Sequence, residues 1–457
     1  MSLSLIHSRK KESFQSKTVW VLGLGVSGRA IARYLVREGA RVHVSDSKTE
    51  VDQEGLKGVT FHLGDDLKEL PVAVDALVLS PGIPQTHPLV QDARSKNTRV
   101  TSEAEIAFAL MEEPVIAITG TSGKTTTTTL IGEMLKKSGF DVFVGGNIGR
   151  PLIEHVMSGV KADFVVAELS SYQLELIESL SPRVAVWTTI DQDHMDRYKS
   201  MENYIEAKKK LLKLCSKSAT LVINRDNRLL KSFAREGNPV LWFTQFEGML
   251  ESGAFYEKAL KQFTLVANDD VTVYSVEQMK MLGEHNIFNL MAAACACVTV
   301  GCKQEAVQSV IDTYPGLPHR IEMVRELGGI RYINDSKATN TVAVKQSLSQ
   351  FEDGKVLWLA GGRDKGIVYS VIGDLVRQKC KSIYFFGESR EKLATIFKPY
   401  SKKITVVETM AEALKAAQTE AKAGDVVLLS PACSSFDQFK SFEDRGDQFK
   451  AMVVKLK

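Results

Sequence analysis

The sequence predicts an α/β protein of three domains, each built on a mainly parallel β-sheet. Apolar runs typical of buried strands alternate with helical segments along most of the chain, which is the pattern of a sheet covered on both faces. A length of 457 residues corresponds to about three domains of ~150 residues each. Breaks in the pattern place the predicted domains at 1–103, 104–316 and 317–457.

Composition excludes several classes of protein. The chain is 44% hydrophobic with a net charge of +3, too small a surplus to predict nucleic-acid or membrane-surface binding. None of the six cysteines forms a Cys-x-x-Cys pair, so we expect reduced thiols in the core. The N-terminus has no apolar signal region, and no run of ~18 apolar residues occurs. We therefore expect a soluble, cytoplasmic protein.

The first domain begins with a strand, a glycine turn and a helix. Thr18–Leu22 is the strand, Gly23-Leu-Gly-Val-Ser-Gly28 is the turn, and Gly39 ends the helix. The next strand, Arg41–Ser45, leads to Asp46, which the dinucleotide fingerprint would place at a ribose hydroxyl. Any nucleotide with a pyrophosphate and a ribose would fit this pattern, and so would a turn that serves packing alone.

Two more strands complete the first domain. They are Val74–Leu79 and the short segment before Ser102. Between them, Ser80-Pro-Gly-Ile83 forms a turn at the carboxyl end of a strand, where α/β sheets place ligands.

The second domain opens on the most informative stretch of the chain. Val115–Ile118 is a buried strand, Gly120-Thr-Ser-Gly123 a turn, and Lys124-Thr125 the start of a helix. This order directs backbone N–H groups and a helix dipole at one point, while the lysine offers a charge and the threonine a hydroxyl for Mg²⁺. Ile118 stands where the general phosphate-loop pattern has its first glycine, so a chance Gly-Lys-Thr is the alternative. The stretch predicts a nucleoside-triphosphate site.

Polar residues follow the next strands of this domain. The strands are Asp141–Val144, Phe164–Ala167 and Arg183–Trp187. The polar residues that come after them are Asn147, Glu168, Asp191, Asp193, His194 and Asp196. Glu168 directly follows a buried strand beside the predicted phosphate site, where phosphate-loop enzymes place a carboxylate that holds Mg²⁺. We predict a metal role for Glu168; the others are also consistent with solvated loops.

The rest of this domain is less specific. A helix spans Met201–Leu214, and its lysine-rich face, which includes Lys208, has the spacing of a solvated surface. Short β-segments are expected within 240–275, and an alanine-rich helix over Leu290–Val300. Asn286 and Asn289 precede or begin this helix, where they could cap it or offer amides to a base.

The third domain follows the break at Tyr314-Pro-Gly-Leu-Pro318. Its predicted strands are Ile330–Ile333, Val356–Ala360, Ile383–Phe386 and Val426–Leu429. Each ends in a glycine-rich or polar turn. In a parallel sheet these turns share one edge, so we expect them to form one face of a cleft.

Several motifs together resemble the Mur ligases. In chain order they are Ile118–Thr125, Glu168–Gln173, Asp193–Tyr198, Glu284–Asn286, Pro318–Arg320, Asn334–Asn340 and Ser430–Cys433. The resemblance runs from Gly23 to Phe442, and it is greatest to the members that add D-glutamate. The stretches Asp335–Asn340 and Ser430–Phe439 single out that branch.

The resemblance implies an architecture and an activity. It implies a Rossmann-like UDP-binding domain, a central parallel-sheet P-loop ATPase domain and a C-terminal Rossmann-like α/β domain. It implies ATP-dependent addition of D-glutamate to UDP-N-acetylmuramoyl-L-alanine through an acyl phosphate, in peptidoglycan precursor synthesis. It also implies ATP and Mg²⁺ as cofactors, with two magnesium sites, and a CO₂-derived carbamate on Lys208; Lys209 and Lys210 leave the register open. We expect a monomer.

The resemblance also assigns residue roles. The catalytic residues would be Lys124, His194 and Lys208, and the magnesium ligands Thr125, Glu168, His194 and Lys208. The ATP contacts would be Gly120, Thr121, Ser122, Gly123, Lys124, Thr125, Thr126, Asn286, Asn289, Arg320, Asp335 and Lys337. The UDP-substrate contacts would be Gly25, Val26, Ser27, Asp46, Ser47, Ser80, Pro81, Gly82 and Asn147. The D-glutamate pocket would be Thr339, Lys365, Ser435 and Phe442.

Three other functions compete with this one. An amide ligase of the same superfamily could use a different amino acid, against which the Ser435–Phe442 region argues. An NAD-dependent oxidoreductase would use the first domain but leave the phosphate loop and Lys208 unexplained. A nucleotide-binding regulator would bind ATP without turnover.

Overall fold

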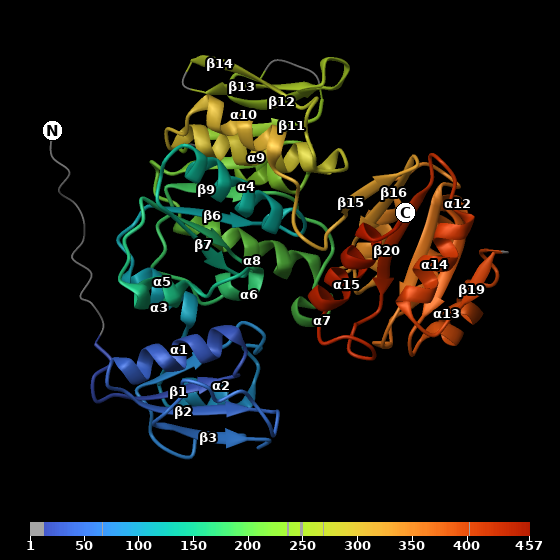
Figure 1. Cartoon of the computed structure of the whole chain (residues 1–457). Helices are drawn as coiled ribbons and strands as arrows, with labels where there is room; N and C mark the ends of the chain where they lie inside the picture. Colours follow the sequence, from blue (N-terminus) through green and yellow to red (C-terminus); the bar gives the residue numbers. More distant parts are fainter. Residues whose placement is uncertain (1–12, 66, 235–236, 247–249, 268, 402) are drawn as a thin grey trace. The chain divides into compact units, whose positions relative to one another are not determined.

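The computed structural model describes residues 13–65, 67–234, 237–246, 250–267, 269–401 and 403–457. They divide into two compact units (Figure 1). The first unit runs to Glu277 and includes Ile287–Ile311, and it contains two sheets. The second unit comprises Gln278–Asn286 and Asp312–Lys457 and contains one sheet. The predicted α/β class, with three largely parallel sheets, is confirmed.

The N-terminal sheet is five-stranded and parallel, in the order β3-β2-β1-β4-β5. Its strands are β1 (Thr18–Leu22), β2 (Arg41–Asp46), β3 (Val59–Leu63), β4 (Ala76–Leu79) and β5 (Arg99–Ser102). Helix α1 (Val26–Arg37) shares a core cluster with Val19 and Val21, and α2 (Pro88–Ser95) packs with Trp20 on the other face. The strand order reverses between β1 and β4, so the Gly23 and Ser80 turns lie at the switch point where such sheets bind ligands.

The central sheet has nine strands, in the order β14-β13-β12-β11-β10-β9-β6-β8-β7. Pairing is parallel from β7 to β12 and antiparallel from β12 to β14. The strands are β6 (Val115–Thr119), β7 (Val142–Gly146), β8 (Phe164–Glu168), β9 (Val184–Trp187), β10 (Thr220–Asn224), β11 (Val240–Thr244), β12 (Gly253–Glu257), β13 (Gln262–Ala267) and β14 (Asp270–Ser275). Every residue of β6, β8 and β9 is buried, which explains their continuous apolar sequences.

Helices connect these strands. They are α3 (Glu103–Leu110), α4 (Lys124–Lys137), α5 (Leu152–Ser158), α6 (Ser171–Leu174), α7 (Met195–Tyr198), α8 (Met201–Leu214), η1 (Leu230–Phe233), η2 (Lys258–Leu260), α9 (His285–Thr299) and α10 (Gln304–Thr313). The predicted helix at 201–214 matches α8 at both ends. The predicted helix at 290–300 starts five residues earlier, at His285.

The sheet of the second unit has the order β15-β16-β20-β17-β18-β19. Only the β15–β16 pair is antiparallel. The elements are β15 (Glu322–Leu327), β16 (Ile330–Asn334), α11 (Thr341–Leu348), β17 (Val356–Gly361), η3 (Tyr369–Ile372), α12 (Gly373–Lys379), β18 (Cys380–Phe386), α13 (Arg390–Phe397), β19 (Ile404–Val406), α14 (Met410–Glu420), β20 (Val426–Ala432) and α15 (Phe442–Val454). Because β16, β20, β17 and β18 are parallel, the turns that follow them share one edge, as predicted.

Two further observations bear on the sequence predictions. All six cysteines are free, and five of them are buried, in agreement with core thiols. Among the described residues, no helix combines the length and apolar character needed to cross a membrane.

Candidate functional site

The phosphate-loop residues form a tight turn between β6 and α4. Gly120 has φ +150° and Gly123 has φ +83°, conformations that side chains with a Cβ rarely adopt. A Cβ on Gly120 would lie 2.0 Å from Thr188 Oγ1, and one on Gly123 would lie 2.4 Å from Asn289 Oδ1. Both positions therefore require glycine. Lys124 Nζ donates to the carbonyls of Gly120 and Thr121, each at 2.9 Å, so the lysine arches over the loop.

Two threonines after β9 hold this loop, and the sequence reasoning did not identify them. Ser122 N donates to Thr189 Oγ1 at 3.0 Å, and Thr188 Oγ1 donates to Ser122 O at 2.6 Å. β9 is paired directly with β6, which brings its polar end beside the turn. The position of Thr188 and Thr189 immediately after a buried strand was the sequence feature that could have identified them. Thr125 and Thr126 lie in the first turn of α4, which has no side-chain cap of its own.

Glu168 ends β8, next to β6, and is 1% exposed. Its Oε1 accepts a hydrogen bond from Asn147 Nδ2 at 2.8 Å. Its Oε2 is buried and has no hydrogen-bond partner. A buried, unpaired carboxylate oxygen is costly unless a cation or donor completes it, so this atom fits a magnesium ligand. Asn147, predicted as a substrate contact, is also the residue that orients Glu168.

Lys208 belongs to α8 and is 1% exposed. Its Nζ donates to Gly120 O at 2.6 Å and lies 4.8 Å from the centre of the Tyr204 ring. Burial, followed by the nearby charge of Lys124, lowers the pKa of Lys208 well below its usual value. Of the three adjacent lysines, Lys208 is the one that reaches the loop. Lys209 pairs with Glu206 instead, and Lys210 donates to Glu175 O.

His194 precedes α7 in a left-handed backbone conformation, with φ 55° and ψ 33°. Its Nδ1 lies 2.9 Å from the Tyr172 hydroxyl. Its ring is 6.1 Å from that of Tyr204, whose hydroxyl lies 2.9 Å from Thr121 Oγ1. Tyr204 thus stands beside both His194 and Lys208, and it links them to the phosphate loop. The Asp196 side chain lies outside the described residues.

The predicted UDP-substrate residues gather at the switch point of the N-terminal sheet. Asp46 accepts backbone hydrogen bonds from Leu24 at 2.7 Å and Lys48 at 3.0 Å. Ser80 Oγ donates to Gly23 O at 2.7 Å. These two side chains therefore shape the turn itself. The Gly25-Val26-Ser27 segment starts α1, and Val26 is exposed. The remaining predicted residues are Ser47, Pro81 and Gly82, which follow β2 and β4.

In the second unit, Asp335 follows β16 and is 3% exposed. Its carboxylate accepts hydrogen bonds from the hydroxyls of Ser347 and Ser430 and from Ile321 N. Burial raises the pKa of Asp335 to about 6, and the two serine hydroxyls oppose that rise. The structure therefore gives Asp335 an internal bracing role that the sequence did not indicate.

Other predicted nucleotide residues also belong to the second unit. The Lys337 ammonium lies 5.5 Å from the Phe442 ring centre. The Asn286 amide donates to Leu282 O at 2.7 Å. Burial, followed by the nearby charge of Arg320, lowers the pKa of His285, and the same charge partly opposes the rise that burial causes in the pKa of Asp335. Asn289, in the first unit, receives a hydrogen bond of 3.3 Å from Thr127 Oγ1 beside Gly123.

The predicted amino-acid residues follow strands of the sheet in the second unit, on loops or, for Phe442, at the start of a helix. Lys365 Nζ and Thr339 Oγ1 are 3.4 Å apart. Ser435 is buried after β20, and Phe442 begins α15. Sequence reasoning missed Arg445, a fully buried arginine that donates to Ser336 and to Cys433 O. It ties the loop after β16 to the end of β20. A charged residue in a helix with ordinary surface spacing gave no signal of this role.

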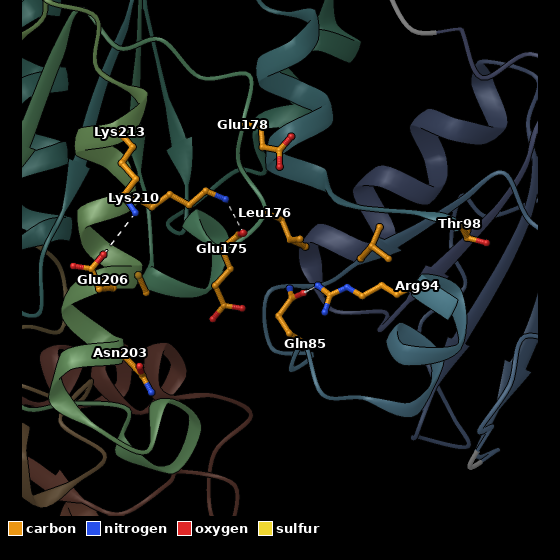
Figure 2. A pocket seen from close by; sticks show the side chains of 12 residues that line it. Gln85, Arg94, Thr98, Glu175, Leu176, Glu178, Asn203, Glu206, Lys210 and Lys213 are labelled. Carbon is orange, nitrogen blue, oxygen red and sulfur yellow. Dashed lines mark hydrogen bonds and ion pairs between the residues drawn. The ribbon is translucent and has the colours of Figure 1, made fainter. Parts of the chain in front are cut away.

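The first unit also contains a cavity of about 740 Å³, shown in Figure 2. Gln85, Arg94, Thr98 and Val100 line one side. The other side is lined by residues of α8 and of the segment that follows α6, including Lys210, which donates to Glu175 O. None of the predicted site residues lines it. The candidate site is therefore the phosphate-loop cluster, which we define as Gly120–Thr126, Glu168, His194, Tyr204 and Lys208.

The unmodified side chains do not form a complete metal site by themselves. In the described part of the chain, no group of three or more His, Cys, Asp and Glu side chains could hold a metal ion. A magnesium ion at Glu168 would need ligands from elsewhere, such as phosphate oxygens, water or a modified lysine.

Comparison with known families matches three models to consecutive parts of the chain. These are the MurD-like N-terminal domain at residues 17–102, the Mur ligase middle domain at 118–297 and the Mur ligase glutamate ligase domain at 319–433.

Curated relatives match over almost the full length. A UDP-N-acetylmuramoylalanine--D-glutamate ligase of Geobacter metallireducens is 38% identical, covering 96% of this chain and 98% of its own. One of Bdellovibrio bacteriovorus is 35% identical, covering 98% and 99%.

Solved structures share the fold at lower identity. A pseudomurein peptide ligase type C from Methanothermus fervidus has a TM-score of 0.58 at 19% identity, covering 97% of this chain and all of its own. The UDP-N-acetylmuramate-alanine ligase MurC of Thermotoga maritima has a TM-score of 0.58 at 17% identity, covering 96% and 100%. Family models across the chain and relatives above 30% identity at full length lead to one conclusion: the chain belongs to the Mur ligase family.

Proposed function

We propose that this Mur ligase uses ATP to join D-glutamate to UDP-N-acetylmuramoyl-L-alanine, releasing ADP and phosphate. The curated relatives that bear the D-glutamate ligase name support this choice of substrates. The observation that carries the chemistry is the buried cluster around Gly120, in which an unpaired carboxylate oxygen and two lysines surround one phosphate-loop turn.

The loop would bind the phosphates of ATP. Backbone N–H groups at the start of α4 and the Lys124 ammonium favour negative charge there, because the helix dipole and the lysine act in the same direction. Asn286, Asn289, Arg320, Asp335 and Lys337 would contact the rest of the nucleotide.

Glu168, Thr125, His194 and Lys208 would hold magnesium, in two sites. When bound, Mg²⁺ neutralises phosphoryl oxygens and stabilises the charge that develops during transfer. The unpaired Glu168 Oε2 is the feature of this chain that fits such an ion.

Lys208 has the properties needed for carbamylation. Only a neutral amine can attack CO₂; a C–N bond then forms at Nζ, a proton leaves, and an anion replaces the amine. Burial and Lys124 favour the neutral form of Lys208, and the product would place an anion beside the Lys124 cation. The carbamate would extend the ligand set begun by Glu168.

The reaction needs activation because a carboxylate is anionic and lacks a leaving group. Transfer of the γ-phosphoryl group to the L-alanine carboxylate of the acceptor gives an acyl phosphate. The D-glutamate amine attacks its carbonyl carbon, and the tetrahedral intermediate expels phosphate to form the amide. The Lys124 ammonium would stabilise the negative charge on the phosphoryl group during these steps.

The remaining predicted residues would bind the other two substrates. The UDP moiety would lie at the switch-point turns that contain Gly25–Ser27, Asp46, Ser47 and Ser80–Gly82, and Asn147 would face the acceptor. Thr339, Lys365, Ser435 and Phe442 would bind D-glutamate, with Lys365 at its side-chain carboxylate. We propose the domain limits 1–103, 104–316 and 317–457 for these three functions, in a monomer that binds only small molecules.

Phosphate release with ATP, Mg²⁺ and UDP-N-acetylmuramoyl-L-alanine tests the proposal. D-glutamate should support release and give a product heavier by one glutamyl unit, while L-glutamate, L-alanine and a diamino acid should not. Release with only another amino acid would keep the ligase chemistry but reject this acceptor specificity. Absence of release with all of them would reject the proposed reaction.

A further inference from the structure

Tyr172 makes a contact with His194 that the predicted roles do not use. Tyr172 lies in α6, four residues after Glu168, and its hydroxyl is 2.9 Å from His194 Nδ1. The two rings are 4.9 Å apart and inclined at 52°. The contact joins the loops that follow β8 and β9, which flank β6 and the phosphate loop.

The backbone of His194 requires support from its surroundings. A non-glycine residue in the left-handed region typically costs about 1 kcal/mol or more and persists only where other contacts hold it. The His194 carbonyl accepts from Arg197 N and Tyr198 N, each at 3.1 Å, and these bonds fix the backbone. The ring, whose side chain is 41% exposed, has Tyr172 as its closest polar contact from another element.

Tyr172 is itself held rigidly. The Arg197 guanidinium lies 4.3 Å from the centre of its ring. Arg197 forms two bonds to Glu175, at 2.7 and 3.1 Å, and Tyr198 donates to the same carboxylate at 2.8 Å. A bidentate arginine pair with restricted solvent access has little freedom, so the Tyr172 hydroxyl is a fixed point against which an imidazole can be oriented.

The position of this hydroxyl has a chemical consequence for the imidazole. A neutral histidine carries one proton, on either Nδ1 or Nε2, and a partner at one nitrogen selects the tautomer. If the Tyr172 oxygen accepts from Nδ1–H, the lone pair on Nε2 is left available. Histidines that bind metals are normally oriented in this way by a second residue.

We propose that Tyr172 is a positioning residue that holds His194 in its Nδ1–H tautomer, with Nε2 available as a ligand. This inference rests on the proposed role of His194 in magnesium binding. In the competing arrangement, the Tyr172 hydroxyl donates to Nδ1, and Nε2–H faces Asp193 Oδ2, 3.5 Å away, which gives the opposite tautomer.

A measurement without substrates or Mg²⁺ tests the tautomer directly. Long-range ¹H–¹⁵N spectra of the full chain with labelled histidine, recorded at alkaline pH, distinguish the two neutral forms, and a His194→Gln variant assigns the signal. The wild type should show Nδ1–H. Tyr172→Phe, which keeps the ring under Arg197, should shift the population toward Nε2–H. A wild-type Nε2–H form, or no change in Tyr172→Phe, would overturn the proposal.

Kinetics supply the second readout. Tyr172→Phe should raise the apparent KM for Mg²⁺ by about ten- to a hundredfold, with a smaller effect on kcat at saturating Mg²⁺. In a His194→Gln background the same substitution should add nothing, because there is no ring left to orient. An equal loss in both backgrounds would mean that Tyr172 acts independently of His194.

Tyr198→Phe is the matched control. It removes a hydroxyl bond to Glu175 from the same network but makes no contact with His194 Nδ1, so its Mg²⁺ dependence should match the wild type. If the wild type shows no ligase activity with any amino acid, the proposed function fails, and the spectra alone decide the role of Tyr172.

Discussion

Two buried carboxylates, Glu168 and Asp335, occupy equivalent places in different sheets and have opposite surroundings. Each comes at or just after the carboxyl end of a parallel strand, and each is at most 3% exposed. Asp335 has hydrogen bonds to both oxygens from Ser347, Ser430 and Ile321 N. Glu168 has one side-chain partner, Asn147, and an unpaired oxygen.

The difference shows that position at a sheet edge does not by itself define a ligand site. A carboxylate whose oxygens are all satisfied stabilises the loops that bond to it. One that keeps an unpaired buried oxygen lowers stability and is available to a cation. This contrast supports the proposed metal-binding role of Glu168, and it shows that Asp335 also connects the segments that bond to it, whether or not nucleotide is bound.

The largest effect is expected from Glu168→Gln. The amide keeps the volume but removes the charge, so proposed magnesium binding should weaken, and ligase turnover should fall on the order of a hundred- to a thousandfold. The melting temperature should stay equal or rise, because a buried carboxylate with an unpaired oxygen is replaced by a neutral amide. Phosphate release and thermal unfolding are the two measurements. Full activity in this variant would contradict the proposed metal-binding role of Glu168.

Asp335→Ala, in contrast, should lower the stability of the protein. Two serine hydroxyls and the Ile321 N–H lose their acceptor, and we expect a loss of about 2–4 kcal/mol in the free energy of unfolding of the second unit. Denaturant unfolding of the full chain, followed by a probe in that unit such as Trp358, measures it. Asp335→Asn retains an acceptor and should lose less. A stable Asp335→Ala protein would contradict the bracing role.

The pH dependence of stability should also identify Asp335. Its pKa is about 6 in the folded chain, against an unfolded value near 3.8, so the folded state binds the extra proton. Its contribution to stability should therefore be greatest below about pH 4 and decrease as the pH rises to about 6. The total change is at most about 3 kcal/mol. Asp335→Asn should remove this part of the pH profile, and an unchanged slope would refute the assignment.

The smallest effects come from the neighbours of the two carboxylates. Asn147→Ala removes the side-chain donor to Glu168 and should lower activity about tenfold, with a stability change of about 1 kcal/mol. Ser430→Ala removes one donor to Asp335 and should cost a similar amount of stability. If the Asn147 variant loses only stability, Glu168 does not depend on it for orientation.

Much of the architecture could be predicted from the sequence because it depends on local patterns. Continuous apolar runs identified β6, β8 and β9, and the glycine turns predicted the two loops at which nucleotides were expected. Strands β3, β10, β15 and β19 were not predicted. β3 and β15 are half-buried and β19 has three residues, so their sequences carried weaker signals. β10 is fully buried, and its apolar run Leu221–Ile223 was a strand signal that the sequence reasoning overlooked.

The sequence by itself also determined which residues come at the ends of strands, and it named Lys124 and Glu168, whereas Lys208 was named only by the resemblance to the Mur ligases. Only the tertiary structure showed that Lys208 reaches Gly120 while Lys209 and Lys210 have other partners. Only the tertiary structure showed that Glu168 keeps an unpaired oxygen, that Asp335 does not, and that Tyr172 contacts His194. The physical reason is that burial and hydrogen-bond satisfaction depend on side chains from separate strands and helices, and no local sequence pattern records which of them meet.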